Sequence, residues 1–166
     1  MASGGKGSPM TRTDAFARDM CKVLNGKCGL EWECGKPQEG NRECADVVGS
    51  NKTTRVLIEV ELRRGTPVGN VAKVWRQSSD TLLEDKIILF QAFSRYYPKK
   101  DTKRKNAVFV GQRMAKHSRV EYIPLETNYL PKKRSVGKAV MQGGGARRRH
   151  ATQLAERVIK RLRKLI

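Results

Sequence analysis

RECADVVGSNKTTRVLIEVELR, residues 42–63, is the stretch of this chain from which the fold is best predicted. Its two ends, 42–48 and 55–62, have the composition of strands, and the polar residues between them are turn formers. The stretch therefore predicts a β-hairpin. If the two strands pair antiparallel about the middle of the loop, Asp46 lies opposite or nearly opposite Glu59.

The second strand of this hairpin has an apolar face and an acidic face, because side chains alternate along a strand. Val56, Ile58, Val60 and Leu62 share one face, and Leu57, Glu59 and Glu61 share the other. Together with Asp46, the two glutamates place three carboxylates in a small area, where like charges repel. We expect a divalent cation among them, Mg²⁺ or Mn²⁺, because carboxylate oxygens are hard ligands. The alternative is a solvated acidic edge on an ordinary hairpin.

This hairpin resembles the active-site hairpin of the PD-(D/E)xK nuclease superfamily, in which an Asp and a (D/E)xK on neighbouring strands gather Mg²⁺ and the attacking water. The resemblance implies that Asp46 is the motif aspartate and Glu59 the first acid of the second half, with the backbone carbonyl of Val60 completing the metal shell. Glu61 stands where the family usually has lysine, as in restriction enzymes of the superfamily that carry ExE. Lys73, in NVAKVWR, is an alternative source of the ammonium group. The resemblance covers about the central third of the chain, and the rest matches by element order only.

The chain is strongly basic, with 35 Lys and Arg against 16 Asp and Glu and a net charge of +19. The excess lies mainly after residue 100, where 18 basic side chains face 4 acidic ones. Such a surface binds polyanions by neutralising phosphates, so we expect a nucleic-acid partner. An anionic membrane surface is the remaining polyanion, and only the C-terminal helix argues for it.

The basic residues expected to contact nucleic acid flank the acidic hairpin or follow it along the chain. They are Arg63, Arg64, Arg76, Lys99, Lys100, Lys103, Arg104, Lys132, Lys133, Arg134, Arg147, Arg148 and Arg149. Tyr96 and Tyr97 lie within the basic loop 94–104, where aromatic rings either stack on bases or close the edge of the core.

Apolar periodicity and turn residues outline the remaining elements. They are a helix from Thr11 or Thr13 to about Leu24, a strand at 29–34, a helix starting at Pro67 or Asn70, a strand at 86–93 buried on both faces, a helix at 106–118, a strand at 120–125 and a final basic amphipathic helix at 151–166. Strand, helix and strand in succession imply a parallel crossover. The expected fold class is α/β, with a mixed central sheet flanked by helices, and the resemblance implies a restriction-endonuclease-like arrangement.

The chain is expected to form one nuclease-like domain at 11–130, after a disordered segment at 1–10. Residues 131–166 are expected to form a basic linker, with the glycines at 143–145 as a flexible joint, and the final helix. That helix packs on the domain, pairs with a second subunit to make a homodimer, or lies along a phosphate backbone.

Neither a run of about 18 apolar residues nor the apolar core of a signal peptide is present, so we expect no membrane span and a cytoplasmic location. The four cysteines, Cys21, Cys28, Cys34 and Cys44, include no CxxC pair. Free thiols are therefore a better interpretation than a zinc site.

The function that these features favour is a Mg²⁺-dependent DNA endonuclease, with Mn²⁺ as a substitute metal. Asp46 and Glu59 are expected to bind the metal, Glu61 to be a further ligand or a base acting through water, and Lys73 to orient the nucleophile or stabilise charge. The alternatives are a catalytically inactive nucleic-acid-binding protein on the same scaffold and a basic ribonucleoprotein component that prefers RNA.

Overall fold

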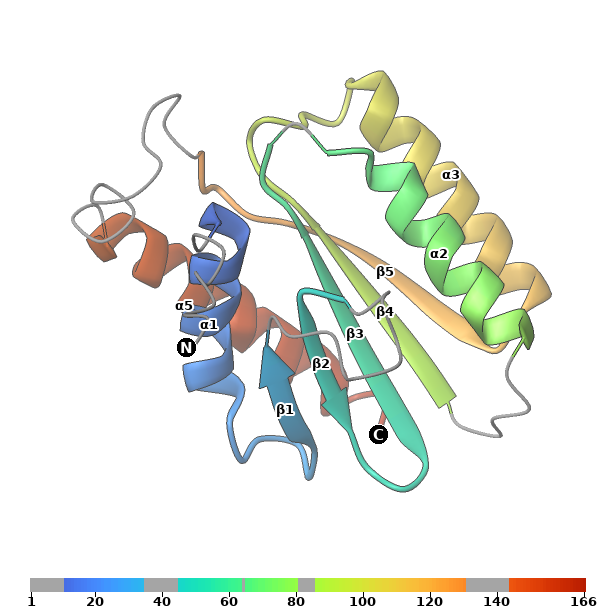
Figure 1. Ribbon diagram of the computed structural model, residues 1–166, viewed down its shortest axis with the longest axis horizontal. Helices are drawn as coiled ribbons and strands as arrows, with labels where there is room; N and C mark the ends of the chain where they lie inside the picture. Colours follow the sequence, from blue (N-terminus) through green and yellow to red (C-terminus); the bar gives the residue numbers. More distant parts are fainter. Residues whose placement is uncertain (1–10, 35–44, 64, 81–85, 131–143) are drawn as a thin grey trace, which may run out of the picture.

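The computed structural model describes residues 11–34, 45–63, 65–80, 86–130 and 144–166. Within these ranges, five strands form one mixed sheet with helices on both faces (Figure 1). The elements are α1 (Arg12–Leu24), β1 (Glu31–Cys34), β2 (Val47–Ser50), β3 (Thr54–Glu61), α2 (Pro67–Asp80), β4 (Lys86–Phe93), α3 (Thr102–His117), β5 (Val120–Glu126) and α5 (Gly144–Leu162). The expected α/β class with a mixed sheet is confirmed.

The strands follow one another across the sheet in chain order, β1-β2-β3-β4-β5. β1, β2 and β3 pair antiparallel, whereas β3, β4 and β5 pair in parallel. In the hairpin, Val47 pairs with Ile58. The next pair outward is therefore Asp46 with Glu59, which is the register that the sequence predicted.

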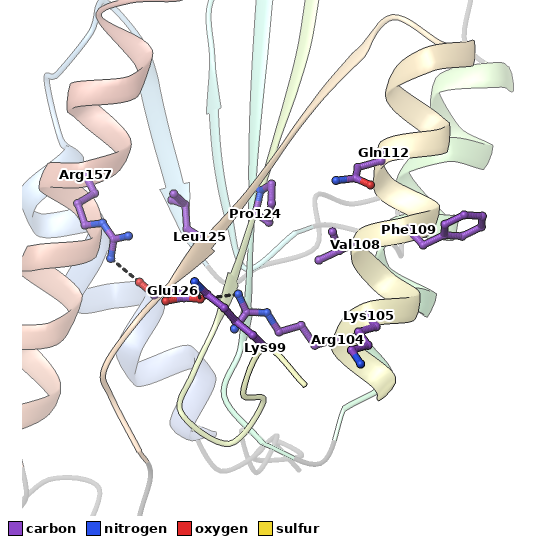
Figure 2. Close-up of a pocket in the computed structure, with 10 residues that line it drawn as sticks. All are labelled: Lys99, Arg104, Lys105, Val108, Phe109, Gln112, Pro124, Leu125, Glu126 and Arg157. Carbon is purple, nitrogen blue, oxygen red and sulfur yellow. Dashed lines mark hydrogen bonds and ion pairs between the residues drawn. The ribbon is translucent and has the colours of Figure 1, made fainter. Parts of the chain in front are cut away.

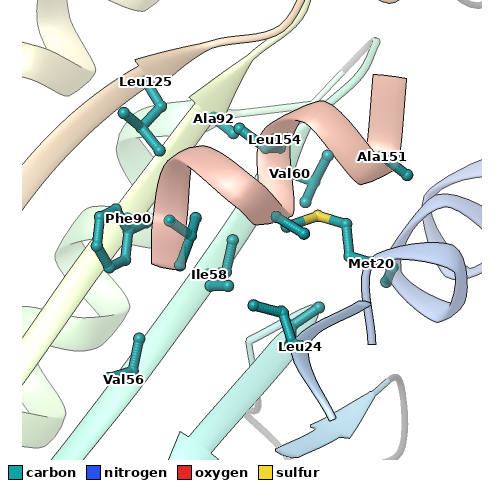
Figure 3. Packing of buried hydrophobic residues seen from close by; sticks show 14 of the residues in the cluster. Met20, Leu24, Val56, Ile58, Val60, Phe90, Ala92, Leu125, Ala151 and Leu154 are labelled. Atoms are coloured by element: carbon teal, nitrogen blue, oxygen red, sulfur yellow. The ribbon is translucent and has the colours of Figure 1, made fainter. Parts of the chain in front are cut away.

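Each face of the sheet is covered by two helices, α1 and α5 on one side and α2 and α3 on the other (Figure 1). Beneath α1 and α5, apolar residues of β3 and β4 such as Ile58 and Phe90 pack against Met20 and Leu154 (Figure 3). Beneath α2 and α3, the core contains Leu57 and Leu89. β3 and β4 are consequently buried on both faces, as expected for β4 from its apolar run.

Several boundaries follow the caps that the sequence supplies. Thr11 caps α1, accepting a hydrogen bond from the backbone N–H of Asp14. α2 begins at Pro67, one of the two expected starts. α3 begins at Thr102, earlier than expected, because the Asp101 carboxylate caps it by accepting from the Arg104 N–H at 3.0 Å. The basic loop is therefore shorter than predicted.

The hairpin turn is also tighter than predicted, because β2 continues through Gly49 and Ser50, which were expected to lie in the loop. Asn51 organises the remaining turn, with its Oδ1 accepting from the backbone N–H groups of Thr53 and Thr54 at 3.0 and 2.9 Å. Residues 42–44, where the first strand was expected to begin, lie outside the described residues.

The C-terminal helix starts before the predicted position, so Gly144 and Gly145 are helical and the expected joint is wrong at these two residues. Residues 1–10 and 131–143, expected to be a disordered segment and part of a linker, lie outside the described residues. α5 buries Leu154, Val158 and Leu162 against the core, so docking on the domain is the alternative that the structure supports. Its exposed face carries basic side chains, among them Arg148, Arg149, Lys160 and Arg161.

Arg147 fixes the start of α5 against α1. Its Nε donates to the Asp19 carboxylate at 2.7 Å, and the two residues are only 9% and 7% exposed. Arg147 is thus occupied inside the protein and does not form part of an exposed phosphate-binding surface, which corrects its expected role. No helix among the described residues is both long and apolar enough to cross a membrane.

We predict that Asp19→Ala lowers the free energy of unfolding by about 3 kcal/mol, because the buried Arg147 guanidinium loses its carboxylate partner. Urea unfolding followed by circular dichroism measures the change. The control is Glu156→Ala, on the exposed face of α5, which should stay within about 0.5 kcal/mol of the parent protein. Equal effects of the two substitutions would show that the ion pair does not hold α1 to α5.

Candidate functional site

The acidic cluster lies at the end of β3, on the face of the sheet that α2 and α3 cover. Glu59 and Glu61 alternate with Val60 along this strand and are only 3% and 4% exposed. A solvated acidic edge, the alternative considered for these residues, is therefore wrong. Carboxylates at this depth need hydrogen bonds or opposite charges, because burying an uncompensated charge is costly.

Asp46 approaches Glu59 from the neighbouring strand, at the residue just before β2 begins. Its Oδ2 accepts a hydrogen bond from the backbone N–H of Val60 at 2.7 Å. The side chain thus takes the place of a backbone partner at the point where the β2 ladder stops. This hydrogen bond fixes the Asp46 carboxylate beside β3, on the side of Glu59.

Lys73 supplies a positive charge from α2. Its Nζ lies 2.7 Å from Glu59 Oε1, and its side chain is 19% exposed. α2 begins at Pro67, soon after β3 ends, so its second turn returns Lys73 over the strand. The expected approach of Lys73 to the carboxylates is therefore present, with Glu59 as its direct partner.

Glu61 is held in a different set of contacts. Its Oε1 accepts from Asn70 Nδ2 at 2.9 Å and from Gln91 Nε2 at 2.8 Å. The same Gln91 amide donates to the Pro67 carbonyl, and its Oε1 accepts from the Tyr122 hydroxyl, both at 2.8 Å. Glu61 is thus built into a buried polar network that joins β3, β4, β5 and α2.

Gln91 and Tyr122 were not predicted from the sequence as members of this network. A signal existed for Gln91, which is the polar residue between Phe90 and Ala92 in a strand expected to be buried on both faces. Such a side chain needs partners inside the protein. Nothing in the spacing of the chain indicates that Glu61 and Tyr122 are those partners, because each lies about thirty residues away.

Burial raises the pKa values of both facing carboxylates. The pKa of Glu59 rises from 4.5 to about 7, because of desolvation first and the Asp46 charge second, against the opposing effect of Lys73. The pKa of Asp46 rises from 3.8 to about 6, mainly by desolvation, against the hydrogen bond from Val60. Even with Lys73 present, this pair lacks enough positive charge to stabilise both ionised forms.

Asp46 and Glu59 fit a hard divalent cation. Each carboxylate uses one oxygen in the contacts described and has a second oxygen that could bind a metal. Their raised pKa values show that nearby positive charge would stabilise the ionised forms. Across the described ranges, no group of three or more His, Cys, Asp and Glu side chains has the geometry of a metal site.

The residues expected to contact nucleic acid divide into three groups. Arg76, Lys99, Lys100, Lys103, Arg148 and Arg149 are exposed, and Arg63 is half-buried, with its guanidinium carbon 5.3 Å from the centre of the Tyr96 ring. Arg104 and Arg147 form ion pairs of 2.6 and 2.7 Å with Glu126 and Asp19. Arg64, Lys132, Lys133 and Arg134 lie outside the described residues.

The two tyrosines of the basic loop take different positions. Tyr97 is 1% exposed and its hydroxyl accepts from the Gly65 N–H at 2.9 Å, so it belongs to the core edge. Tyr96 is 39% exposed and stacks edge-on against Tyr97. Only Tyr96 therefore has a ring available to a ligand beside Arg63.

No protein family, curated protein or solved structure matches the chain in the comparisons made with known proteins.

We predict that the protein becomes less stable as the pH rises from about 4.5 to about 7 in the presence of EDTA. In this window the folded state holds protons on Glu59 and Asp46 that the unfolded chain has already released, so raising the pH favours unfolding. Melting temperatures measured across the range should fall, and Glu59→Gln should remove most of that fall. An unchanged slope in this variant would contradict the raised pKa of Glu59.

We also predict that Gln91→Leu lowers the free energy of unfolding by at least about 2 kcal/mol, because Glu61 and Tyr122 both lose a buried partner. Gln112→Leu, at an exposed position on α3, is the matched control and should have little effect. Urea unfolding compares the two. If they lose equal stability, the network does not stabilise the fold.

Proposed function

We propose that this protein is a metal-dependent endonuclease that hydrolyses phosphodiester bonds in DNA. One observation carries the proposal, namely that Asp46 and Glu59 on neighbouring strands and Lys73 on α2 converge at one buried site. The pKa values of the two acids are raised to about 6 and about 7, so a bound cation would favour their ionised forms. Fold stability alone does not explain this arrangement, because buried groups with such perturbed pKa values cluster at functional sites.

Asp46 and Glu59 hold the metal in this proposal, and the backbone carbonyl of Val60 is a third ligand that the family resemblance suggests. A bound Mg²⁺ or Mn²⁺ supplies positive charge for the phosphate and a water of lowered pKa. Lys73 exchanges part of its contact with Glu59 for the attacking water or the phosphate. Arg63, at the rim, neutralises a phosphate oxygen. Glu61 positions Asn70 and, with it, the first turns of α2.

The fold supports the proposal at the level of element order. An acidic hairpin, a helix carrying the lysine and a parallel strand follow one another as the resemblance to the PD-(D/E)xK superfamily implies. DNA is the proposed partner because the net charge of +19 favours a polyanion and the proposed chemistry acts on phosphodiesters. The corresponding assembly is a homodimer, in which each subunit cleaves one strand of a duplex.

A DNA-binding protein without cleavage activity is the second candidate. The observation that favours it is that both glutamates have partners inside the protein, since Glu59 contacts Lys73 at 2.7 Å and Glu61 contacts two side-chain amides. In that case Lys73 is the permanent counter-ion of Glu59, and the site needs no metal.

We predict that Asp46→Asn and Glu59→Gln each slow plasmid nicking in Mg²⁺ or Mn²⁺ by at least about 100-fold, because each removes a charged metal ligand. Lys73→Met should have an effect in the same direction. Glu121→Gln is the control, because this carboxylate lies on β5 of the same sheet in a surface ion pair with Lys86. Fluorescence anisotropy in EDTA should show that all four variants still bind DNA.

Nicking by Asp46→Asn at the rate of the parent protein would overturn the proposed active site. DNA binding without nicking in either metal would establish the second candidate instead. Competition between duplex DNA and RNA of equal length tests the choice of polymer, and stronger binding to RNA would favour a ribonucleoprotein component.

A further inference from the structure

Strand β5 is an edge of the sheet, and two hollows meet beside its carboxyl end. One, of about 530 Å³, lies between α3 and β5, and Figure 2 shows the residues that line it. The other, of about 410 Å³, lies between the end of β5 and α5. Glu126 and Arg157 line both hollows, so the two form one groove, called here the β5 groove.

Basic side chains line the β5 groove along its length. Lys99, Arg104 and Lys105 belong to its α3 side, Lys160 to its α5 side, and Arg157 to both hollows. Lys105 and Lys160 are exposed. Of these five residues, only Lys99 and Arg104 were predicted from the sequence to contact nucleic acid.

Glu126 holds the middle of the groove together. Its Oε1 accepts from Arg104 Nη2 at 2.6 Å and lies 3.8 Å from Lys99 Nζ, while its backbone carbonyl accepts from Arg157 Nη1 at 2.5 Å (Figure 2). The pKa of Glu126 is lowered, first by its hydrogen bond from Arg104. Glu126 thus holds three basic side chains from separate parts of the chain, two by its carboxylate and one by its backbone carbonyl, and the lining keeps a net positive charge.

The β5 groove begins close to the candidate site. In the sheet register, Glu61 pairs with Phe93 and Phe93 with Glu126, so the three residues form one row across β3, β4 and β5. Two strand spacings separate Glu61 from Glu126, about 10 Å. The Arg104 guanidinium lies over the Phe93 ring at 5.0 Å, between the two acids. That separation corresponds to about three nucleotides at the rise of B-form DNA.

We propose that the β5 groove binds the phosphate backbone of a nucleic-acid strand that continues from the candidate site. The path of the strand, from the candidate site into the groove, rests on the proposed function. The binding of phosphates rests on the basic residues of the groove itself. Guanidinium and ammonium groups facing one recess match a row of phosphates. A second copy of this chain does not match it, because it carries the same net charge of +19.

The test uses the full-length protein, a fluorescein-labelled 20-nucleotide oligo-dT and EDTA, so that binding is measured without cleavage. Lys105→Glu combined with Lys160→Glu should weaken binding at least about tenfold, and should lower the salt dependence of log K by about 1.4 for two lost phosphate contacts. The matched control is Lys27→Glu with Lys52→Glu, two exposed lysines at the opposite end of the sheet. It makes the same change in net charge and should weaken binding less than threefold.

Glu126→Gln is a second variant with the opposite expected effect. It removes one of the two carboxylates that line the groove, the other being Glu156, while its amide oxygen still accepts from Arg104, so oligo-dT should bind more tightly. Unchanged or weaker binding by this variant counts against the groove. Equal losses of affinity for oligo-dT in the two double variants would overturn the groove proposal, because the protein would then bind by overall charge alone.

Competition with polyglutamate separates nucleic acid from an acidic protein partner. Displacement of oligo-dT by an equal concentration of polyglutamate charges would overturn the choice of occupant. Because no step requires a metal, groove binding in a protein that fails to nick plasmid would leave this proposal standing and reject only the nuclease. If the parent protein nicks plasmid but the groove variants bind oligo-dT as tightly as it does, the groove proposal is rejected and the nuclease proposal stands.

Discussion

Two buried acids at the carboxyl end of β3, a strand covered on both faces, constrain the rest of this structure. Glu59 and Glu61 lie on β3 between layers of helices, where an ionised carboxylate is unstable without partners. Lys73 provides the charge for one and the Gln91 and Asn70 amides the hydrogen bonds for the other. α2 must therefore start close to the end of β3, and β4 must place a polar residue beside Glu61.

The two faces of the sheet consequently serve different purposes. The face under α1 and α5 is an apolar core, closed at its edge by the buried pair of Asp19 and Arg147. The face under α2 and α3 combines a smaller apolar core with the acids and their partners.

The basic side chains likewise have two uses. Arg147 and Arg104 are tied to carboxylates and organise α5 and the start of α3, whereas Lys105, Lys160 and Arg148 face solvent. A count of charges predicts a polyanion partner but does not separate these two sets. The ion pair of Arg104 with Glu126 lies where the β5 groove opens, among the exposed basic side chains that line it.

Local periodicity alone determined the hairpin, its register, the buried strand β4 and the helix that carries Lys73. These features depend on neighbours in the chain, because side chains alternate along strands and recur every three or four residues along helices. Only the tertiary structure decided that Arg147 pairs with Asp19, that Glu61 turns to Gln91 and that α5 begins at Gly144. Such choices depend on side chains that meet across as many as 128 positions, and the desolvation of those groups, which sets their partners, appears only when the layers pack.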